Sequence, residues 1–374
     1  MLQRLEKALI RPVTGIPIII CIMIGVFLFI GRFVAQTVVD FTQGFLFGTL
    51  YYNFILGYAN TFFDLDSFLG YLLFGEYGLL TMIPIYLFGL LLPLVFSFYF
   101  IMTLLQDSGI FFRISILADK VFRAIGLSGG AIVPIVLGFG CVTAALISVG
   151  TLKSKREQLI ASALLCFSFP CSAQLTIVLA LSALLEIKYI LLYFFTIFTI
   201  FLFSGFILNF LIPGKSEKYI PRLPPLCVPK ISTAFKRTVR DSKDFLIDAT
   251  PSFIIGGALM AILHYTNSFV KIYKLFSPLT SGLLHLPDQA TDLFLLSIIK
   301  KDVAAASLYS IVSQNIMTDF QIAITLIVMT LFVPCFASAM VLFKDRGPLV
   351  AIIIYITCFF VGFAAGGLIN IIFS

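Results

Sequence analysis

Two Pro-Cys pairs interrupt apolar segments of membrane-spanning length, at Phe169-Pro170-Cys171 and at Phe332-Val333-Pro334-Cys335. Proline removes a backbone donor from a helix, and cysteine offers a soft sulfur ligand beside the break. In hydrocarbon, such a break is tolerated only where protein covers it or where it lines a cavity. The two matched breaks therefore predict the two halves of a transport site.

The sulfur and oxygen atoms near these breaks predict a transient site for a soft or borderline metal cation. Thiolate ligands suit Fe²⁺ better than Mg²⁺ or Na⁺, and an ion that is transported must also leave its ligands. The predicted metal ligands are Cys141, Cys335, Cys171 and Cys166, and the predicted pathway residues are Gly138, Gly140, Pro170, Gln174, Asp302, Pro334 and Ser338.

Purely structural roles also stay open for these residues. A free cysteine often packs as a small apolar side chain, and a Gln or Ser side chain can simply hydrogen-bond between helices. Asp302 can form a local ion pair with Lys300 or Lys301 instead of facing a pathway.

The composition indicates that the chain lies in a membrane. Of the 374 residues, 60% are hydrophobic and 11% are charged, whereas soluble domains are about 25% charged. Stretches of about 20 apolar residues predict spanning helices, here Gly15–Val39, Met82–Leu105, Gln158–Leu185, Tyr189–Ile212, Thr250–Tyr265, Gln321–Phe343 and Pro348–Ile372. The predicted fold class is an all-α polytopic membrane protein, without a cleavable signal peptide. The Lys and Arg residues behind the net charge of +7 indicate which loops face the cytoplasm, and no nucleic-acid partner is expected.

Basic residues cluster within residues 4–11, 153–156, 215–243 and 344–346. The positive-inside rule places all four clusters, and the N-terminus, in the cytoplasm of a cell whose inner (plasma) membrane holds the chain. This holds only if Ala131–Val149 enters and leaves the membrane on the same side, as a re-entrant hairpin. The sequence Gly138-Phe139-Gly140-Cys141 is expected to form its flexible tip.

A similar hairpin is expected at Leu293–Leu308, with its break at Lys300-Lys301-Asp302. The two hairpin breaks are 162 residues apart and the two prolines are 164 residues apart. Two features that recur at nearly one offset predict an internal duplication. Because the basic clusters make the two hairpins enter from opposite sides, the fold is predicted to hold inverted-topology repeats with re-entrant hairpins and broken helices.

The predicted domain organisation follows from these elements. Residues 1–14 form a cytoplasmic N-terminus, 15–80 a first span and an outer interfacial segment, 81–212 the first gate repeat, 213–249 a basic cytoplasmic linker, 250–346 the second gate repeat, and 347–374 a C-terminal span. Within these domains, Asp40–Tyr77 is expected at the outer interface, and Phe111–Ile125 and Phe235–Ile247 are expected as amphipathic helices at the inner leaflet.

Several ordered motifs resemble the membrane portion of the ferrous iron transport protein B family. They are Leu105-Gln106-Asp107-Ser108-Gly109, Gly126-Leu127-Ser128-Gly129, Gly138-Phe139-Gly140-Cys141, Thr151-Leu152 through Arg156-Glu157, Arg237–Leu246, Lys301-Asp302-Val303-Ala304-Ala305 and Val333-Pro334-Cys335. The resemblance runs from about Arg11 to the C-terminus. The sequence departs from the family in two ways: no N-terminal G-domain is expected, and Val142-Thr143-Ala144-Ala145 stands where the family tends to have Asn-Val-Pro-Ala.

This resemblance implies uptake of ferrous iron through two gate repeats, with Cys141, Cys335 and Cys171 in the pathway. Fe²⁺ is then the transported ion, no cofactor is bound permanently, and no enzyme activity is expected. The partner hypotheses are the lipid bilayer, a separately encoded G protein or small accessory protein at the cytoplasmic face, and a homo-oligomer. Two other functions stay open: a gate-repeat transporter of another solute such as a nucleoside, and a membrane scaffold that transports nothing.

Overall fold

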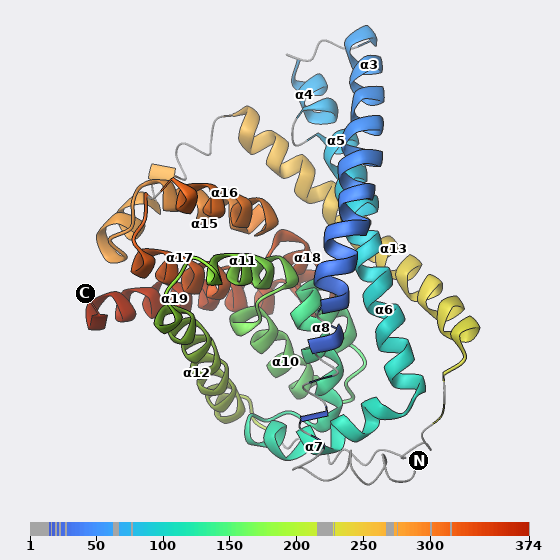
Figure 1. The fold of residues 1–374 in the computed structure, drawn as a ribbon, viewed down its shortest axis with the longest axis vertical. Coiled ribbons are helices and arrows are strands. Elements are labelled where there is room, and N and C mark those ends of the chain that lie inside the picture. The colour runs from blue at the N-terminus through green and yellow to red at the C-terminus, as the bar shows by residue number, and fades with distance from the viewer. Residues whose placement is uncertain are drawn as a thin grey trace. The chain divides into compact units, whose positions relative to one another are not determined.

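The computed structural model describes residues 15–373 except 16, 19–20, 22–23, 27, 63–66, 76–77, 215–226, 228, 267–272, 275, 300 and 315. The described residues form helices and connecting turns, with no strand among them. This confirms the all-α fold class. The chain divides into two compact units: residues 1–120 with 219–268, and residues 121–218 with 269–374. Both units contain segments from each half of the sequence (Figure 1).

The first unit is built around three helical stretches that pack on one another. Its elements are η1 (Phe29–Val38), η2 (Asp40–Tyr51), α3 (Tyr52–Phe62), α4 (Phe68–Phe74), α5 (Leu79–Pro84), η3 (Ile85–Leu91), α6 (Leu92–Asp107), most of α7 (Ile110–Ala124) and α13 (Ile231–Tyr265). In this unit η2 packs on η3, and α13 packs along α6.

The predicted end of the first span at Val39 is wrong, because the helical backbone continues through η2 and α3 to Phe62. A polar residue beyond this point, Thr42, is accommodated within the packed helices. Thr42 Oγ1 donates to the Gly89 carbonyl oxygen at 2.6 Å and to that of Val38 at 2.9 Å. A methyl group on Gly89 would lie 3.0 Å from Gln43 Cα, so this glycine permits the close approach of η2 and η3. The placement of Asp40–Tyr77 at the outer interface stays a prediction, and its Asp64, Asp66 and Glu76 lie outside the described residues.

One helix of 35 residues, α13, replaces two elements that were predicted separately. The amphipathic stretch Phe235–Ile247 and the apolar stretch Thr250–Tyr265 are continuous, because a buried face runs through both of them. That face includes Ala234, Thr238, Ser242, Phe245 and Ala249. The predicted start of the second repeat at residue 250 therefore falls inside a helix.

The second unit contains the same order of elements twice. The first series is a hairpin of α8 (Ile132–Gly140) and α9 (Val142–Val149), a broken pair of α10 (Lys155–Ser168) and α11 (Ser172–Ser182), and the long α12 (Ile187–Leu211). The second series is a hairpin of α15 (Gln289–Ile299) and α16 (Lys301–Ser313), a broken pair of α17 (Asp319–Leu331) and α18 (Phe336–Arg346), and the long α19 (Pro348–Phe373). The short helices η4 (Gly129–Ala131) and η5 (Leu279–Leu283) precede the two hairpins. Both predicted hairpins and both helix breaks are present.

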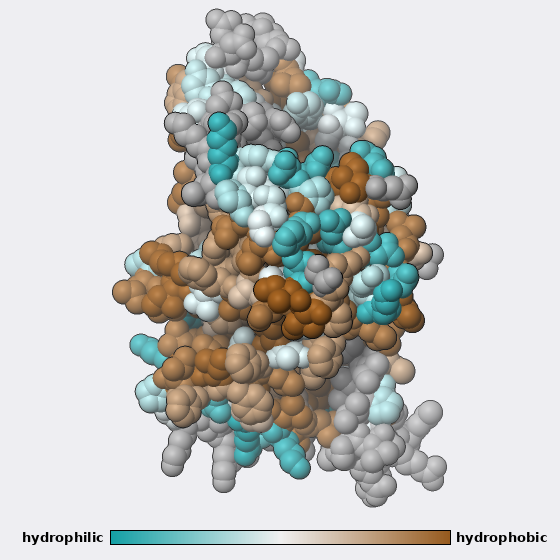
Figure 2. Space-filling model, turned by 90° about the vertical axis from the view of Figure 1, so that its left-hand side faces the viewer, coloured by the Kyte–Doolittle hydropathy of each residue, from teal (hydrophilic) through white to brown (hydrophobic). Residues whose placement is uncertain are grey.

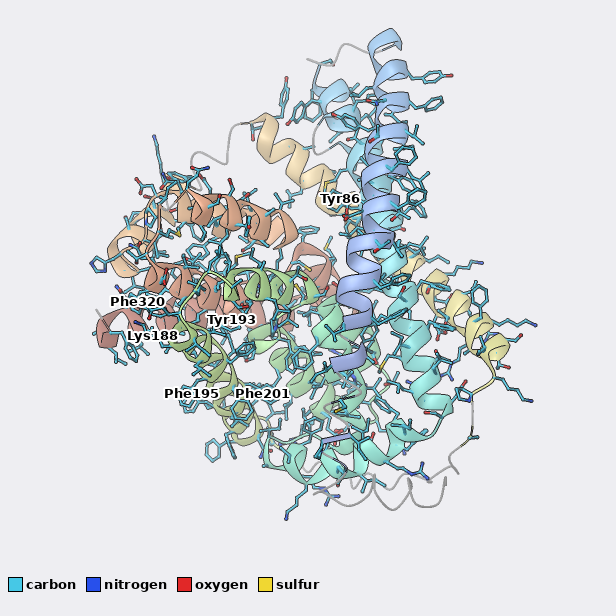
Figure 3. The ribbon with its side chains drawn as sticks, viewed as in Figure 1. Tyr86, Lys188, Tyr193, Phe195, Phe201 and Phe320 are labelled. Carbon is cyan, nitrogen blue, oxygen red and sulfur yellow. The ribbon has the colours of Figure 1, made fainter. Side chains whose placement is uncertain are left out.

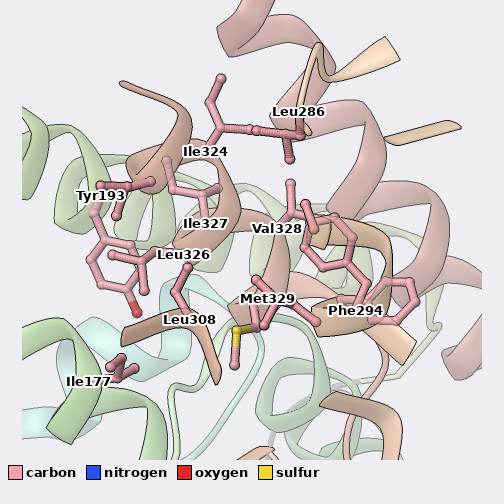
Figure 4. Packing of buried hydrophobic residues seen from close by; sticks show 14 of the residues in the cluster. Ile177, Tyr193, Leu286, Phe294, Leu308, Ile324, Leu326, Ile327, Val328 and Met329 are labelled. Atoms are coloured by element: carbon pink, nitrogen blue, oxygen red, sulfur yellow. The ribbon is translucent and has the colours of Figure 1, made fainter. Parts of the chain in front are cut away.

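The core of the second unit joins the two series. Helix α17 is buried on all sides, and Ile324, Ile327, Val328 and Met329 lie in one cluster with side chains of α11, α12, α15, α16 and α19 (Figure 4). On α19, a methyl group added to Gly366 would collide with a methyl carbon of Val328, so α19 approaches α17 closely at a glycine. The two breaks are therefore held by a shared, densely packed core.

Four helical stretches in the described part of the chain are long and apolar enough to cross a membrane: Phe68–Asp107, Ile187–Leu211, Asp319–Arg346 and Pro348–Phe373. Many apolar side chains are exposed on the face shown in Figure 2. Exposed apolar residues on membrane-length helices are expected where the solvent is lipid. The chain is a multi-pass membrane protein. The predicted span Gln158–Leu185 consists of the two shorter helices α10 and α11, divided at the predicted break.

Candidate functional site

The first break lies between α10 and α11, where Phe169, Pro170 and Cys171 have no helical hydrogen-bonding pattern. Cys171 occupies the N-cap position of α11, and Gln174 is the third residue of that helix. Gln174 is 2% exposed; its Oε1 accepts from the Cys171 N–H at 3.3 Å, and its Nε2 donates to the Met329 carbonyl oxygen at 2.7 Å. Gln174 thus ties the start of α11 to the last turn of α17, which precedes the second break.

The second break lies between α17 and α18, and Cys335 occupies the N-cap position of α18. Ser338 is completely buried, and its Oγ lies 3.0 Å from Cys335 Sγ while donating to the Cys335 carbonyl oxygen at 2.9 Å. The hydroxyl of Tyr355, on α19, lies 3.1 Å from the Cys335 carbonyl oxygen and 3.3 Å from that of Pro334. Tyr355 therefore supplies a donor to carbonyl oxygens at the second break, of which that of Cys335 also accepts from the Ala339 N–H of α18 at 3.2 Å.

The two breaks match position by position. An offset of 164 residues relates Pro170 to Pro334, Cys171 to Cys335 and Gln174 to Ser338. Both prolines are buried, both cysteines are half-buried N-caps, and both residues at the third helical position are buried and face back toward the cap. The structure thus places the predicted pathway residues of the two repeats in equivalent local settings.

The first hairpin reverses at Cys141, and its glycines play a different part from the predicted one. Gly138 and Gly140 belong to α8, whereas Cys141 is extended, with φ −146° and ψ 117°, and forms the N-cap of α9. A methyl group on Gly138 would lie 2.6 Å from a methyl carbon of Leu165 on α10. The expected flexible glycine tip is therefore wrong: Gly138 is helical and provides space for α10 to pack.

One contact joins the first hairpin to the second break. Thr143 Oγ1, on α9, lies 3.7 Å from Cys335 Sγ, across 192 residues of sequence. The first hairpin, near its reversal at Cys141, is thus in contact with the second break at Cys335.

The remaining predicted residues are less directly connected to this region. Cys166 is 4% exposed within α10. Asp302 lies in α16, and its side chain is outside the described part of the structure, as is Lys300. Among the described residues, no three His, Cys, Asp or Glu side chains form a group that could hold a metal ion. The cysteines therefore form a dispersed set and not a closed coordination site.

The polar ends of α9, α11 and α18 give this region its electrostatic character. Each helix starts at one of the half-buried cysteines, and a helix N-terminus carries partial positive charge that favours a negatively charged sulfur. The preceding helices α8, α10 and α17 end beside the same cysteines, with carbonyl oxygens that favour a cation. The arrangement can therefore place thiolate and carbonyl ligands next to one another.

Two functional residues escaped the sequence reasoning. Thr143 differs from the family pattern after Cys141, but its type and position alone do not indicate a contact with a residue 192 positions away. Tyr355 lies inside an apolar span and is preceded by no motif. The sequence also did not indicate that Tyr193 and Thr330 form a buried pair, with their hydroxyl oxygens 3.0 Å apart. Through this pair Tyr193 joins α12 to α17 (Figure 3).

Motifs distant in the sequence meet in the structure. Arg156 donates to the carbonyl oxygens of Gly126, Asn209 and Ile212 and, at 2.6 Å, to Asn209 Oδ1. The neighbouring Glu157 is 2% exposed and accepts from Ser128 Oγ at 2.7 Å. Gly126-Leu127-Ser128-Gly129 and Arg156-Glu157 thus form one interaction unit, which holds the start of the first hairpin against α10.

A second pair of motifs meets in the first unit. Asp107 Oδ1 at the end of α6 lies 3.7 Å from Arg237 Nη1 on α13. The following Gly109 has a φ of +77°, a conformation that glycine adopts without strain, and so it allows the chain to turn after α6. Both pairs of motifs therefore hold helical segments together.

Comparison with known proteins agrees with these motifs. The family model described as "Gate: Nucleoside recognition" matches residues 88–185, which include the first hairpin and the first break. The Fe(2+) transporter FeoB of Staphylococcus aureus (strain COL) is 24% identical over 379 residues, covering 92% of this chain and 54% of that protein. The chain is similar to this FeoB transporter along most of its length. The resemblance to the membrane portion of that family is confirmed.

Two other FeoB proteins match shorter parts. The Methanocaldococcus jannaschii protein is 28% identical over 176 residues, covering 46% of this chain and 26% of that protein. The Legionella pneumophila (strain Lens) protein is 37% identical over 86 residues, covering 23% of this chain and 11% of that protein. The chain spans about half the length of the FeoB of S. aureus, so its own activity and partners are matters for proposal.

Proposed function

We propose that this chain forms the membrane pathway of a ferrous iron transporter in the cell inner membrane, with a cytoplasmic N-terminus. The relatives that match along most of the chain are named Fe(2+) transporters. The observation that carries the proposal is the approach of Thr143 in the first hairpin to Cys335 at the second break, because it brings the polar ends of both repeats together. Inverted repeats bind their substrate at such a junction, near the middle of the membrane.

In this proposal, the thiols of Cys141, Cys171 and Cys335 bind Fe²⁺ in turn, and Cys166 contributes from deeper in α10. Each thiol loses its proton when it binds the metal, and the helix N-terminus beside it stabilises the negative sulfur. Ser338 Oγ lies 3.0 Å from Cys335 Sγ, and its hydroxyl, which donates to the Cys335 carbonyl oxygen, can turn to donate to that thiolate. An ion that is transported must also leave its ligands, so we propose that each thiol binds it only transiently.

The residues around the cysteines keep the two breaks open and in place. Pro170 and Pro334 prevent the helices from closing across the breaks, and Gly138 lets the first hairpin pack closely on α10. Gly140, the last residue of α8, is proposed to lie beside the pathway at the turn of this hairpin. Gln174 and Ser338 position the two N-caps through their hydrogen bonds. Asp302, in α16, is the proposed carboxylate of the pathway on the second hairpin.

The test is Fe²⁺ uptake by liposomes that contain the purified chain. Replacing a sulfur ligand should weaken transport, so Cys335→Ser and Cys141→Ser are expected to lower the Fe²⁺ uptake rate by about tenfold or more. Cys21→Ser is the matched control, because Cys21 is exposed and lies outside the site. Equal Fe²⁺ entry into liposomes with the parent chain, with the variants and without protein would reject the proposal and favour a scaffold.

A second candidate substrate is a nucleoside, because the family model that matches residues 88–185 is described by nucleoside recognition. A nucleoside site requires several polar side chains that can pair with a base and a sugar, and Gln174, Ser338 and Thr143 are the polar groups at the breaks. Uptake of radiolabelled uridine or adenosine by the same liposomes tests this candidate. Nucleoside entry without Fe²⁺ entry would replace the iron proposal.

The proposed partners are a separately encoded G protein or a small accessory protein at the cytoplasmic face, and a second copy of the chain. Light scattering of the purified protein in detergent measures its mass, and a monomeric mass would reject the homo-oligomer. If a G protein drives transport, Fe²⁺ uptake should rise when that protein and GTP are placed on the cytoplasmic side. Uptake that is unchanged by both additions would reject this partner.

A further inference from the structure

Arg346, the last residue of α18, bridges this helix to α10 in the other repeat. Its Nη1 donates to Gln158 Oε1 at 2.7 Å, and its Nε donates to Ser162 Oγ at 3.3 Å. Gln158 and Arg346 are half-buried, and Ser162 is completely buried. Arg346 and Gln158 are 188 residues apart in the sequence, so the bridge joins the two repeats only in the folded chain.

The bridge connects the corresponding halves of the two broken helix pairs. Helix α10 begins beside the basic cluster at residues 153–156 and ends at the first break, whereas α18 begins at the second break and ends in the basic cluster at 344–346. The positive-inside rule places both clusters in the cytoplasm, so each helix runs between a break and the cytoplasmic side. The 11 residues of α18 extend about 16 Å. Because the hydrocarbon core is about 30 Å thick, a break at its middle puts Arg346 near the cytoplasmic edge.

Polar and sulfur side chains lead along both helices from the breaks to this bridge. On α10, Gln158, Ser162 and Cys166 recur at every fourth position and therefore share one face. On α18, Ser338 at the second break and Arg346 are two such steps apart, so they also share a face. The hydrogen bonds of Arg346 turn these two faces toward each other at their cytoplasmic ends. The two faces thus mark a route from the breaks toward the cytoplasm, and Arg346 stands at its end.

The guanidinium group of Arg346 is a barrier to cations that can be moved. Its positive charge repels a metal cation, as an arginine at the constriction of a channel does. The two side chains that it binds are neutral, and its Nη2 is buried with no hydrogen-bond partner in the described part of the chain. Hydrogen bonds to neutral groups are weaker than hydrogen bonds to carboxylates, so this bridge opens more easily than an ion pair would.

We propose that Arg346 is the cytoplasmic gate of the transport pathway, which rests on the transport function proposed above. The bridge to Gln158 and Ser162 is the closed state of the gate. When the bridge opens, the long side chain of Arg346 turns toward the cytoplasmic water, and a cation bound at Cys335 can leave along the α10 and α18 faces. A barrier that closes one end while the site is filled from the other is what alternating access in an inverted repeat requires.

The test measures how fast charged methanethiosulfonate reagents label Cys335 from the cytoplasmic side. Inverted membrane vesicles expose that side, and mass spectrometry of the purified chain identifies the labelled cysteine. One reagent is a cationic trimethylammonium compound and the other an anionic sulfonate, and neither crosses a bilayer. Lys344→Gln is the matched control, because it removes the same charge from an exposed residue on the opposite side of α18.

For Arg346→Gln, we expect the cationic reagent to label Cys335 at least about fivefold faster than in the parent chain, and the anionic reagent to gain less. Gln158→Glu keeps the acceptor oxygen and converts the hydrogen bond into an ion pair, so it should slow labelling by both reagents. Combining Gln158→Glu with Arg346→Gln should remove this slowing. Lys344→Gln should label at the rate of the parent.

Three results would overturn the gate. They are equal rates for Arg346→Gln and the parent, including no labelling of either, an equal effect of Lys344→Gln, and faster labelling of Gln158→Glu by the cationic reagent. The labelling requires no Fe²⁺ transport, so the two proposals can fail separately. Thiol-dependent Fe²⁺ uptake together with unchanged labelling would reject the gate alone. The expected labelling without any Fe²⁺ uptake would support the gate and reject iron as the transported solute.

Discussion

Replacement of Gln174 by methionine tests the physical account of the first break. The substitution keeps the size and flexibility of the side chain but removes its bonds to the Cys171 N–H and the Met329 carbonyl oxygen. Hydrogen bonds inside membrane proteins contribute on average about 0.6 and at most about 1.7 kcal/mol each. Two lost bonds at a site that is 2% exposed should therefore lower the free energy of unfolding by about 1 to 3 kcal/mol.

Gln321 offers a matched control. It also stands at the third position of a helix, accepts from the N-cap Thr318 N–H at 3.0 Å, and donates to a distant carbonyl oxygen, that of His285, at 2.9 Å. The bonds of Gln321 are exposed, so water can replace them, and Gln321→Met should lower the free energy of unfolding by less than about 1 kcal/mol.

The assay is denaturant titration of the purified protein in detergent, followed by the loss of helical circular dichroism. Fe²⁺ uptake by liposomes is measured in parallel. We expect Gln174→Met to lower both stability and uptake, and Gln321→Met to leave uptake unchanged. Equal losses of stability in the two variants would refute the reasoning that burial makes the Gln174 bonds irreplaceable.

Three further predictions concern packing, a polar tie and pH. Gly138→Ala should lower the free energy of unfolding by about 1 to 3 kcal/mol, because the new methyl group meets the side chain of Leu165, whereas Gly282→Ala, with open space around it, should not lower stability in the same titration. Arg156→Lys keeps the charge but loses the guanidinium fork that binds Gly126 and Asn209. Because this fork holds the start of α10 in place, we expect trypsin to cleave the variant faster at Lys153 or Lys155. A cleavage rate equal to that of the parent would contradict this role. Fe²⁺ uptake should fall as pH falls, because protons compete with the metal for the thiols. The Cys335→Ser variant should show a weaker pH dependence of uptake than the parent chain. Parallel pH profiles of the variant and the parent would argue against a thiolate ligand at this position.

Local chemistry made the helix breaks predictable. Proline lacks the N–H that a helix needs, so Pro170 and Pro334 mark the interruptions wherever the chain folds. The two hairpins were also predictable, because short apolar arms around a break cannot each span a membrane. The role of Gly138 was not, since a glycine can supply either flexibility or space, and the neighbouring Leu165 decides for space.

Polar residues in apolar surroundings were harder to interpret from the sequence. The first span was predicted to end at Val39, but the helix continues, and the hydroxyl of Thr42 beyond that point donates to the carbonyl oxygen of Gly89 on another helix. In the same way, Phe235–Ile247 looked like a separate interfacial helix, because its charged face differs from the apolar stretch that follows. Its buried face, which only packing against α6 reveals, is continuous with that stretch.

The sequence by itself determined the class of this protein, the positions of its breaks and its relation to FeoB, because these depend on composition and on residues close together in the chain. The tertiary structure alone decided what the break residues touch. Thr143 approaches Cys335 from 192 residues away, Gln174 reaches Met329 from 155 residues away, and Tyr355 supports the carbonyl oxygens of the second break from another helix. Such contacts depend on how α9, α11, α17 and α19 pack, and no local pattern of residue types encodes that packing.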